Sequence, residues 1–259
     1  MPLLAWILIF TVVGGALSAL AASTFLAVPE RWRTSLLPHL VSFATGALLS
    51  AALLGLLPHA IEGAGTQQSH RIGLTLLVGL LIFFVLEKLV LWRHCHQEVC
   101  EGHLPHDHGR ERAAAWLILI GDGFHNVVDG VLIAAAFMTD VHLGVVTAIA
   151  VTAHEIPQEV GDLAILLHGG MSRSRALTLN LLTSITSVIG GLAAYFALGN
   201  ATQALPYALA LAASSFLYIA VADLIPGLHR RVDPGSGARQ LAVILLGVVV
   251  IYVSHALAH

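Results

Sequence analysis

Eight long apolar runs, separated by short polar loops, constrain this 259-residue chain more than any other feature. The runs occupy residues 3–28, 36–61, 72–92, 113–137, 142–168, 174–198, 204–227 and 239–257. Each has about the 20 mostly apolar residues that a transmembrane helix needs. Only 10% of the residues are charged and 57% are hydrophobic, whereas soluble domains carry about 25% charged residues. The sequence therefore predicts one all-α integral membrane domain over residues 1–259, and it excludes a water-soluble enzyme and a nucleic-acid-binding protein.

Arginine is concentrated in the loops that follow the odd-numbered runs. These loops contain Arg31, Arg33, Arg93, Arg110, Arg112, Arg173, Arg175, Arg230, Arg231 and Arg239. The other loops contain Arg71 alone. Because cytoplasmic loops are enriched in Lys and Arg, we expect the odd loops in the cytoplasm and both termini outside. The short loops favour a bacterial inner (plasma) membrane, with periplasmic termini.

The third loop, residues 93–112, is rich in histidine. It contains His94, His96, His103, His106 and His108, besides Cys95 and Cys100. Such tracts often bind zinc and similar metals, although a solvated linker has the same composition. Two cysteines in one polar loop do not indicate a disulfide framework.

A short echo links the second and seventh runs. They end in GLLPHAIE and ADLIPGLH, and they cross the membrane in opposite directions. The shared proline favours inverted repeats of three helices on either side of a central pair, a 3+2+3 plan found in transporters.

Polar side chains interrupt the fourth and fifth runs. They are His125, Asn126 and Asp129 with Asp122 one turn earlier, then His154, Glu155, Gln158, Glu159 and Asp162. One charge at mid-membrane costs about 2.5–3.5 kcal/mol on insertion scales, so the whole set indicates function. His125 and Asp129 share a helix face, as do His154 and Gln158, because each pair is spaced i, i+4. Imidazole with carboxylate suits zinc and its first-row neighbours, which predicts a cation site between the two helices.

Other residues are candidates for the path to and from this site. On the cytoplasmic side we expect the acidic residues Asp122, Glu159 and Asp162. On the outer side the residues that could gather cations are His59, Glu62, His70, Asp140 and His142.

Two segments carry a family resemblance. HNVVDG (125–130) and HEIPQEVGD (154–162) resemble the paired signatures of the ZIP family, the Zrt/Irt-like zinc and iron transporters. GALLSAALLGLLPHA (46–60) and FLYIAVADLIPG (216–227) are also similar to family segments. The resemblance implies a homodimeric eight-helix transporter that takes a divalent metal ion into the cytoplasm by alternating access, with a mobile helix bundle carrying the site. Zn²⁺ is the expected substrate, and Cd²⁺, Fe²⁺, Co²⁺ and Mn²⁺ are further candidates.

The resemblance also implies the ligands. His125, Asp129, His154 and Gln158 would form a primary site, and Asn126, Asp129 and Glu155 would belong to a second. Gln158 stands where relatives place a carboxylate or histidine, and Ser187 is the nearest match to a carboxylate of the sixth helix. Both departures remove charge, so we expect one transported ion rather than a tight two-metal centre.

Three other functions fit parts of the pattern. HEIPQ is similar to the HExxH motif of zinc proteases, but Gln158 replaces the second histidine. His125 and His154 suit a haem cytochrome with two axial histidines, which leaves the carboxylates unexplained. A metal exporter would have the same site. The favoured function is non-enzymatic zinc import, and the alternatives are an intramembrane zinc metalloprotease or a metal exporter.

Overall fold

The computed structural model describes residues 1–95, 108–168, 170–229 and 234–256, which contain helices and no β-strand. All eight predicted segments are helical. The helices are α1 (Leu3–Ala27), α2 (Glu30–Ser50), α3 (Leu57–Ala64), α4 (Ser69–Cys95), α5 (His108–Thr139), α6 (Val141–His168), α7 (Arg173–Ser184), α8 (Thr186–Gly199), α9 (Leu205–Tyr218), α10 (Ile225–His229) and α11 (Pro234–Ala256). Short 3₁₀ turns at Thr66–Gln68 and Thr202–Ala204 precede α4 and α9.

Seven stretches of the described chain are long and apolar enough to cross a membrane, by length and composition. They are Leu3–Ala27, Glu30–Ala64, Thr66–Lys88, Ile118–Thr139, Arg173–Gly199, Thr202–His229 and Gly237–His255. The predicted fifth span, α6, is not among them, because its C-terminal half carries His154 and three carboxylates. This polar helix packs against α1, α2, α5, α7 and α11, which shield it from the surroundings.

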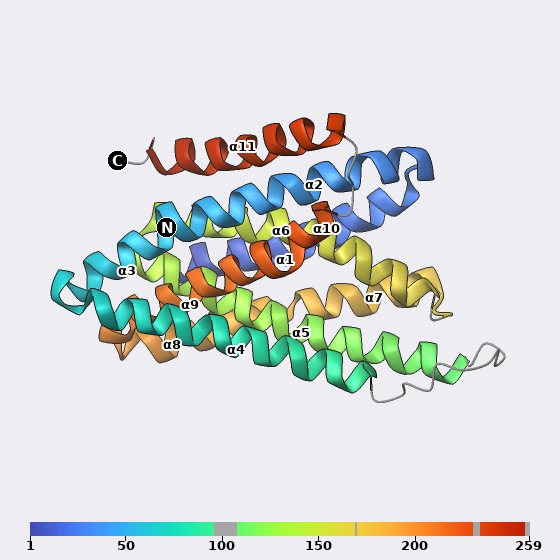
Figure 1. Cartoon of the computed structure of the whole chain (residues 1–259). Coiled ribbons are helices and arrows are strands. Elements are labelled where there is room, and N and C mark those ends of the chain that lie inside the picture. Colours follow the sequence, from blue (N-terminus) through green and yellow to red (C-terminus); the bar gives the residue numbers. More distant parts are fainter. Residues whose placement is uncertain (96–107, 169, 230–233, 257–259) are drawn as a thin grey trace.

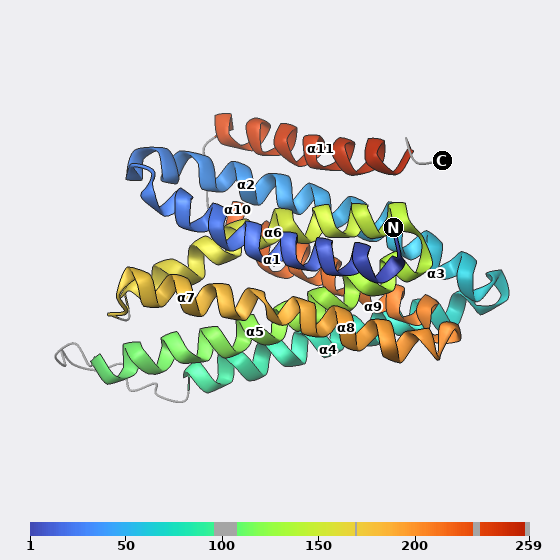
Figure 2. The same cartoon turned by 180° about the vertical axis from the view of Figure 1, so that it is seen from behind.

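The helices run side by side (Figure 1), with α2 and α11 along one edge and α4 and α8 along the opposite edge. The first residues of α1 and the last of α11 lie at the same end of the molecule. The C-terminal end of α4 and the N-terminal end of α5 lie at the other end, as Figure 2 shows from behind. Large apolar side chains such as Leu81, Phe196 and Leu245 point outward from α4, α8 and α11, as lipid contact requires.

The stretches Glu30–Ala64 and Thr202–His229, which are the second and seventh predicted runs, both contain a π-helical turn before a proline. Ala51–Leu56 joins α2 to α3 and is followed by Pro58, while Ile219–Leu224 joins α9 to α10 and is followed by Pro226. In each case the proline is the second residue after the π-turn. Such turns insert an extra residue and are frequent at functional sites. The two stretches are therefore similar in backbone conformation as well as in sequence.

The helices reach into the predicted histidine-rich loop. Because α4 ends at Cys95 and α5 begins at His108, His94 and His108 belong to helices. His96, His103 and His106 lie outside the described residues. Metal binding by this loop stays a prediction.

Candidate metal centre

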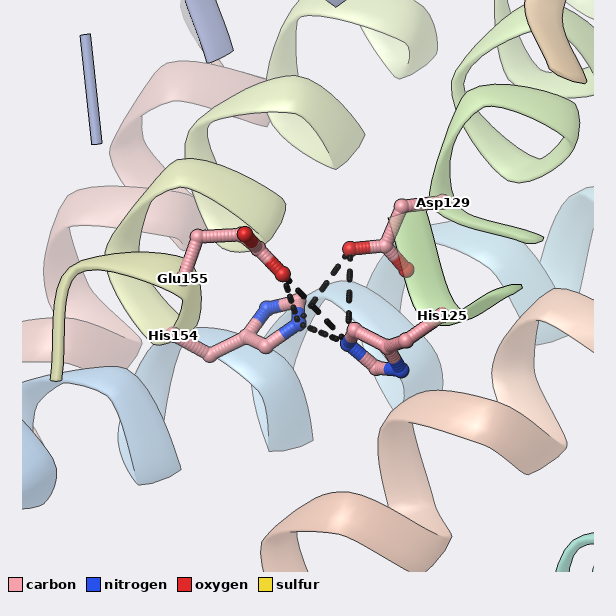
Figure 3. A group of neighbouring side chains, drawn as sticks. All are labelled: His125, Asp129, His154 and Glu155. Atoms are coloured by element: carbon pink, nitrogen blue, oxygen red, sulfur yellow. Dashed lines mark hydrogen bonds and ion pairs between the residues drawn. The ribbon is translucent and has the colours of Figure 1, made fainter. Parts of the chain in front are cut away.

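Four side chains of α5 and α6 direct their ligand atoms at one another (Figure 3). His125 and Asp129 lie one turn apart on α5, and His154 and Glu155 are neighbours on α6. Nε2 of His154 lies 3.2 Å from Nε2 of His125 and 3.3 Å from Oδ2 of Asp129. Nε2 of His125 lies 3.4 Å from Oε1 of Glu155 and 3.7 Å from Oδ2 of Asp129. The remaining measured separation, His154 Nε2 to Glu155 Oε1, is 3.8 Å.

These separations match the size of a zinc coordination shell. Zn²⁺ favours four ligands in a tetrahedron, with bonds of about 2.0–2.1 Å to nitrogen and oxygen, so the tetrahedron's edges measure about 3.3–3.4 Å. The five measured separations span 3.2–3.8 Å. Five of the six separations among the two imidazoles and two carboxylates therefore lie within about 0.5 Å of those edges.

A contact with the backbone of α6 orients the His154 imidazole. Nδ1 of His154 lies 3.1 Å from the carbonyl oxygen of Ala150, one turn earlier on α6. We assign the proton to Nδ1, which donates it to that carbonyl and leaves a lone pair on Nε2, as is usual for metal-binding histidines. The ring also meets the edge of Phe216 on α9, with centroids 6.2 Å apart.

Both carboxylates of the cluster are buried, and their oxygens accept no hydrogen bond from the described residues. A buried anion without a hydrogen-bond donor is costly unless a cation compensates it. Asp129 and Glu155 therefore favour a positive ion at the point where the four ligands meet.

A cavity of about 410 Å³ adjoins the cluster at His125. The His125 side chain is 24% exposed, whereas the other three side chains of the cluster are 1% exposed. The polar residues that line the cavity are Glu87, Asp122, Gln158, Asp162, Ser215, Tyr218 and Asp223. Asp122 precedes His125 on α5 and Asp162 follows His154 on α6, so the cavity lies toward the start of α5 and the end of α6.

A second carboxylate cluster shares Glu155 with the first. Asp122, Glu155 and Glu159 have oxygens within 4.8 Å of one another, and all three residues are buried. Glu159 accepts a hydrogen bond from the Ser184 hydroxyl at 2.8 Å and another from the amide of Asn180. These bonds direct Glu159 toward α7.

The other two expected ligands differ in position. Gln158 lines the cavity beside His125. Asn126 is turned toward the second cluster, because its Nδ2 donates to Oδ1 of Asp122 at 3.0 Å.

Ser187, in the sixth predicted run, was the expected counterpart of a carboxylate in relatives. Its side chain forms hydrogen bonds with backbone atoms. Its hydroxyl donates to the carbonyl oxygens of Ser184 at 2.7 Å and Thr11 at 3.2 Å. Ser184, one turn earlier, is the residue that contacts a carboxylate of the second cluster.

Comparison with known proteins identifies the family. The profile described as "ZIP Zinc transporter" matches residues 3–112 and 93–255, almost the entire chain. The chain belongs to the ZIP zinc transporter family. This confirms the resemblance of the two paired motifs, and it favours a membrane transporter over an enzyme.

Several curated ZIP proteins are similar to the chain. Zinc transporter ZIP13 of Pongo abelii is 32% identical over 229 residues, which are 83% of this chain and 65% of that protein. Human zinc transporter ZIP4 is 30% identical over 258 residues, 77% of this chain and 40% of that protein. Zinc transporter foi of Drosophila melanogaster is 44% identical over 114 residues, 44% of this chain and 16% of that protein. The chain thus spans about two thirds or less of the length of these three relatives.

Histidines also meet at the opposite end of this ZIP chain. Nδ1 of His59 lies 2.9 Å from the carbonyl oxygen of Gly55, and its ring meets the edge of His255 at 5.6 Å between centroids. Glu62 lies one turn along on α3 and is exposed. His255, on the last helix, was not among the residues predicted from the sequence to gather cations with His59.

Asp140 caps α6 at the same end. Its Oδ1 accepts the backbone N–H of His142 at 2.8 Å and that of Leu143 at 3.0 Å. Partial burial acts to raise the pKa of Asp140, but these hydrogen bonds outweigh it, so the pKa lies below its ordinary value.

Sequence reasoning missed three cavity residues, Glu87, Tyr218 and Asp223. Tyr218 donates a hydrogen bond to Glu87 and so ties α9 to α4. Both carboxylates lie inside apolar runs, where a charge is costly. A search for charged residues within the third and seventh runs would have found Glu87 and Asp223.

Proposed function

We propose that this ZIP protein carries Zn²⁺ across a membrane into the cytoplasm through the site between α5 and α6. The convergence of ligand atoms from His125, Asp129, His154 and Glu155, which all lie within 4.8 Å of one another, is the observation that carries the proposal. Two nitrogen ligands favour zinc over harder cations, and Cd²⁺, Fe²⁺, Co²⁺ and Mn²⁺ are further candidate substrates.

The membrane plan that fits this function has eight spans in a 3+2+3 arrangement, with α6 as a span enclosed by its neighbours. An even number of crossings agrees with the two chain ends lying on one side. The arginine-rich loops favour a cytoplasmic location for the other side, which puts both termini outside the plasma membrane. The family resemblance further favours a homodimer.

Close glycine contacts divide the helices into two groups. In the first group, a Cβ on Gly15 would meet the backbone of Ser184, and one on Gly190 would meet that of Val127. These contacts join α1 to α7 and α8 to α5. Because backbone atoms cannot rotate away, the helices of such pairs move together. With α6, which packs on α1 and α5, they form the group that holds the metal ligands.

The second group is joined by one contact with backbone and one with a side chain. A Cβ on Gly46 would meet the backbone of Ile244, and one on Gly79 would meet the side chain of Ser214. These contacts join α2 to α11 and α4 to α9. Between the groups, a Cβ on Gly55 would meet side chains of α6, Leu143 at 3.3 Å and Val146 at 4.0 Å. We propose that the first group moves against the second and carries the ion.

In this proposal the cavity beside His125 is the cytoplasmic exit. It lies at the end of α6 that precedes the arginine-rich fifth loop, and carboxylates from both groups line it. The conformation is therefore inward-facing, with Asp122 and Asp162 as the next oxygen ligands along the path.

The decisive experiment measures zinc flux into proteoliposomes under an imposed zinc gradient, for the wild type, Asp129→Asn and Glu30→Gln. Asp129→Asn keeps the shape of the side chain and removes the shared anionic ligand, so saturable flux should disappear. Glu30→Gln removes an exposed carboxylate at the start of α2, and its flux should equal that of the wild type. Normal flux in Asp129→Asn would refute the site.

Two further outcomes separate the alternatives. Stoichiometric zinc binding by a wild type without flux would favour a protease or a sensor, and peptide-cleavage assays would follow. Zinc accumulation in cells that express the protein supports import, while zinc loss from them would show export.

A further inference from the structure

A second cavity lies at the same end of the molecule as the proposed exit, but on the side of α1 and α7. Its volume is about 290 Å³, close to the lower end of the range for small-ligand pockets, about 300–1,000 Å³. The final turns of α1 and α6 and the first turns of α2 and α7 surround it. Its lining residues are Ser23, Leu26, Ala27, Arg33, Leu163, Leu167, Arg173, Ala176 and Leu177.

The charge in this cavity is entirely positive. Arg33 of α2 and Arg173 of α7 line it, and none of its lining residues is acidic. Nε of Arg33 is buried and has no hydrogen-bond partner among the described residues. A buried guanidinium N–H without an acceptor is unfavourable, so this group indicates a ligand that supplies an oxygen.

The start of α7 adds to the positive field. Arg173 is the first residue of this 12-residue helix, and the Ser172 hydroxyl accepts only the N–H of Arg175, at 3.4 Å. Backbone N–H groups in a first helical turn lack intrahelical partners and favour anions. Two guanidinium groups beside such a turn suit a phosphate, which Arg binds through paired hydrogen bonds.

The remaining walls are apolar. Leu26, Leu163, Leu167 and Leu177 come from α1, α6 and α7. A free phosphate has no apolar surface to bury against such walls, whereas the glycerol and first acyl carbons of a phospholipid would pack against them. In the proposed membrane plan, on which this step rests, the cavity lies where arginine-rich loops meet the cytoplasmic face, the level at which lipid phosphates are found.

We propose that this cavity binds a phosphate group between Arg33 and Arg173, supplied by an anionic phospholipid. The site is separate from the metal centre and does not depend on zinc transport. It joins the two helix groups, because α2 belongs to one and α6 and α7 to the other.

The test measures retention of phosphatidylglycerol by the purified full-length protein, using native mass spectrometry, with phosphatidylcholine as the neutral reference. The wild type should retain phosphatidylglycerol preferentially. Arg33→Gln and Arg173→Gln should each weaken retention by about 10–100-fold, because a hydrogen bond to a charged group contributes about 1.5–3 kcal/mol. Arg31→Gln is the matched control, since Arg31 is exposed at the start of the same helix and does not line the cavity.

Every outcome bears on the proposal. Equal losses in Arg31→Gln and Arg33→Gln would overturn it, since general attraction to anionic lipid would then explain retention. Arg33→Lys guards against misfolding: it keeps the charge, and it should weaken retention because it loses Nε. Displacement of the lipid by millimolar inorganic phosphate would support the phosphate site and make the soluble ion its source. A wild type that binds neither probe refutes the site, whatever its zinc flux.

Discussion

Gly15→Ala tests whether the contact between α1 and α7 sets the geometry of the metal centre. A Cβ on Gly15 would lie 2.6 Å from the carbonyl oxygen of Ser184 and 3.2 Å from the Cβ of Ser184. Ordinary carbon–oxygen contacts measure about 3.3–3.6 Å, so the two helices must separate by about 0.7–1.0 Å. No change of rotamer relieves the clash, because the oxygen belongs to the backbone.

The displacement reaches the metal ligands through two residues. The Ser184 hydroxyl donates to Oε1 of Glu159 at 2.8 Å, and Glu159 lies within 4.8 Å of Glu155. Changes to such supporting partners lower metal affinity by about 10–100-fold. Over-packing itself costs about 1–3 kcal/mol, which corresponds to roughly 2–12 °C in Tm for a chain of this size.

Gly14→Ala is the matched control. A Cβ on Gly14 would lie 3.4 Å from Oγ1 of Thr152, an ordinary contact. Both substitutions gain the same helix propensity, about 1 kcal/mol, which cancels when the two variants are compared. Thermal melting in one detergent and zinc titration then isolate the clash. Equal Tm values and equal zinc affinities in Gly14→Ala and Gly15→Ala would refute the reasoning.

Three further substitutions test other parts of the structure. Gln158→Glu adds a carboxylate beside His125 and should tighten zinc binding by roughly tenfold, because ligand charge tunes metal affinity; unchanged affinity in calorimetry would mean that residue 158 does not reach the ion. Tyr218→Phe removes the hydrogen bond to Glu87 and should lower the free energy of unfolding by about 1–2 kcal/mol, which an unaltered Tm would contradict. Asp140→Ala removes the cap of α6 and should cost about 1 kcal/mol at pH 7. Since the folded-state pKa of Asp140 is lowered, this difference is fully present above the ordinary pKa near 3.9 and is lost as the pH falls through the lower folded-state pKa; a difference in Tm that does not begin to shrink below about pH 4 would contradict a contribution from the charged carboxylate.

Which residues share a face of one helix was predictable, but which faces of two neighbouring helices meet was not. The i, i+4 separation of His125 and Asp129 places them on one face of α5, and the structure has them there. On α6 the same rule pairs His154 with Gln158, and the structure also brings Glu155 to the cluster, while Gln158 lines the adjoining cavity together with His125. Which neighbour of His154 meets α5 depends on how the two helices are rotated, and the sequence does not express that rotation.

The helical segments themselves were predictable because transmembrane helices need long apolar runs. The second helical segment begins at Glu30 rather than at the predicted residue 36. Its N-cap is Pro29, so its first turns are polar and precede the apolar run from which the segment was predicted. Contacts between distant spans, such as Tyr218 with Glu87 and His59 with His255, depend on packing and leave no mark in local spacing. They could be suspected only from charges and histidines in otherwise apolar surroundings.

In the proposed site, the unequal exposure of the four side chains would determine the order in which a bound ion loses them. Water from the cavity reaches the cluster at His125, whose side chain is 24% exposed, while the other three ligands are enclosed. Zinc has no geometric preference of its own and accepts a fifth ligand, so a water molecule can bind before His125 departs. Under the proposed function, ligand exchange would then be associative and would start at one imidazole. The displacement of that single side chain would set the residence time of the ion and, with it, an upper limit on the turnover rate.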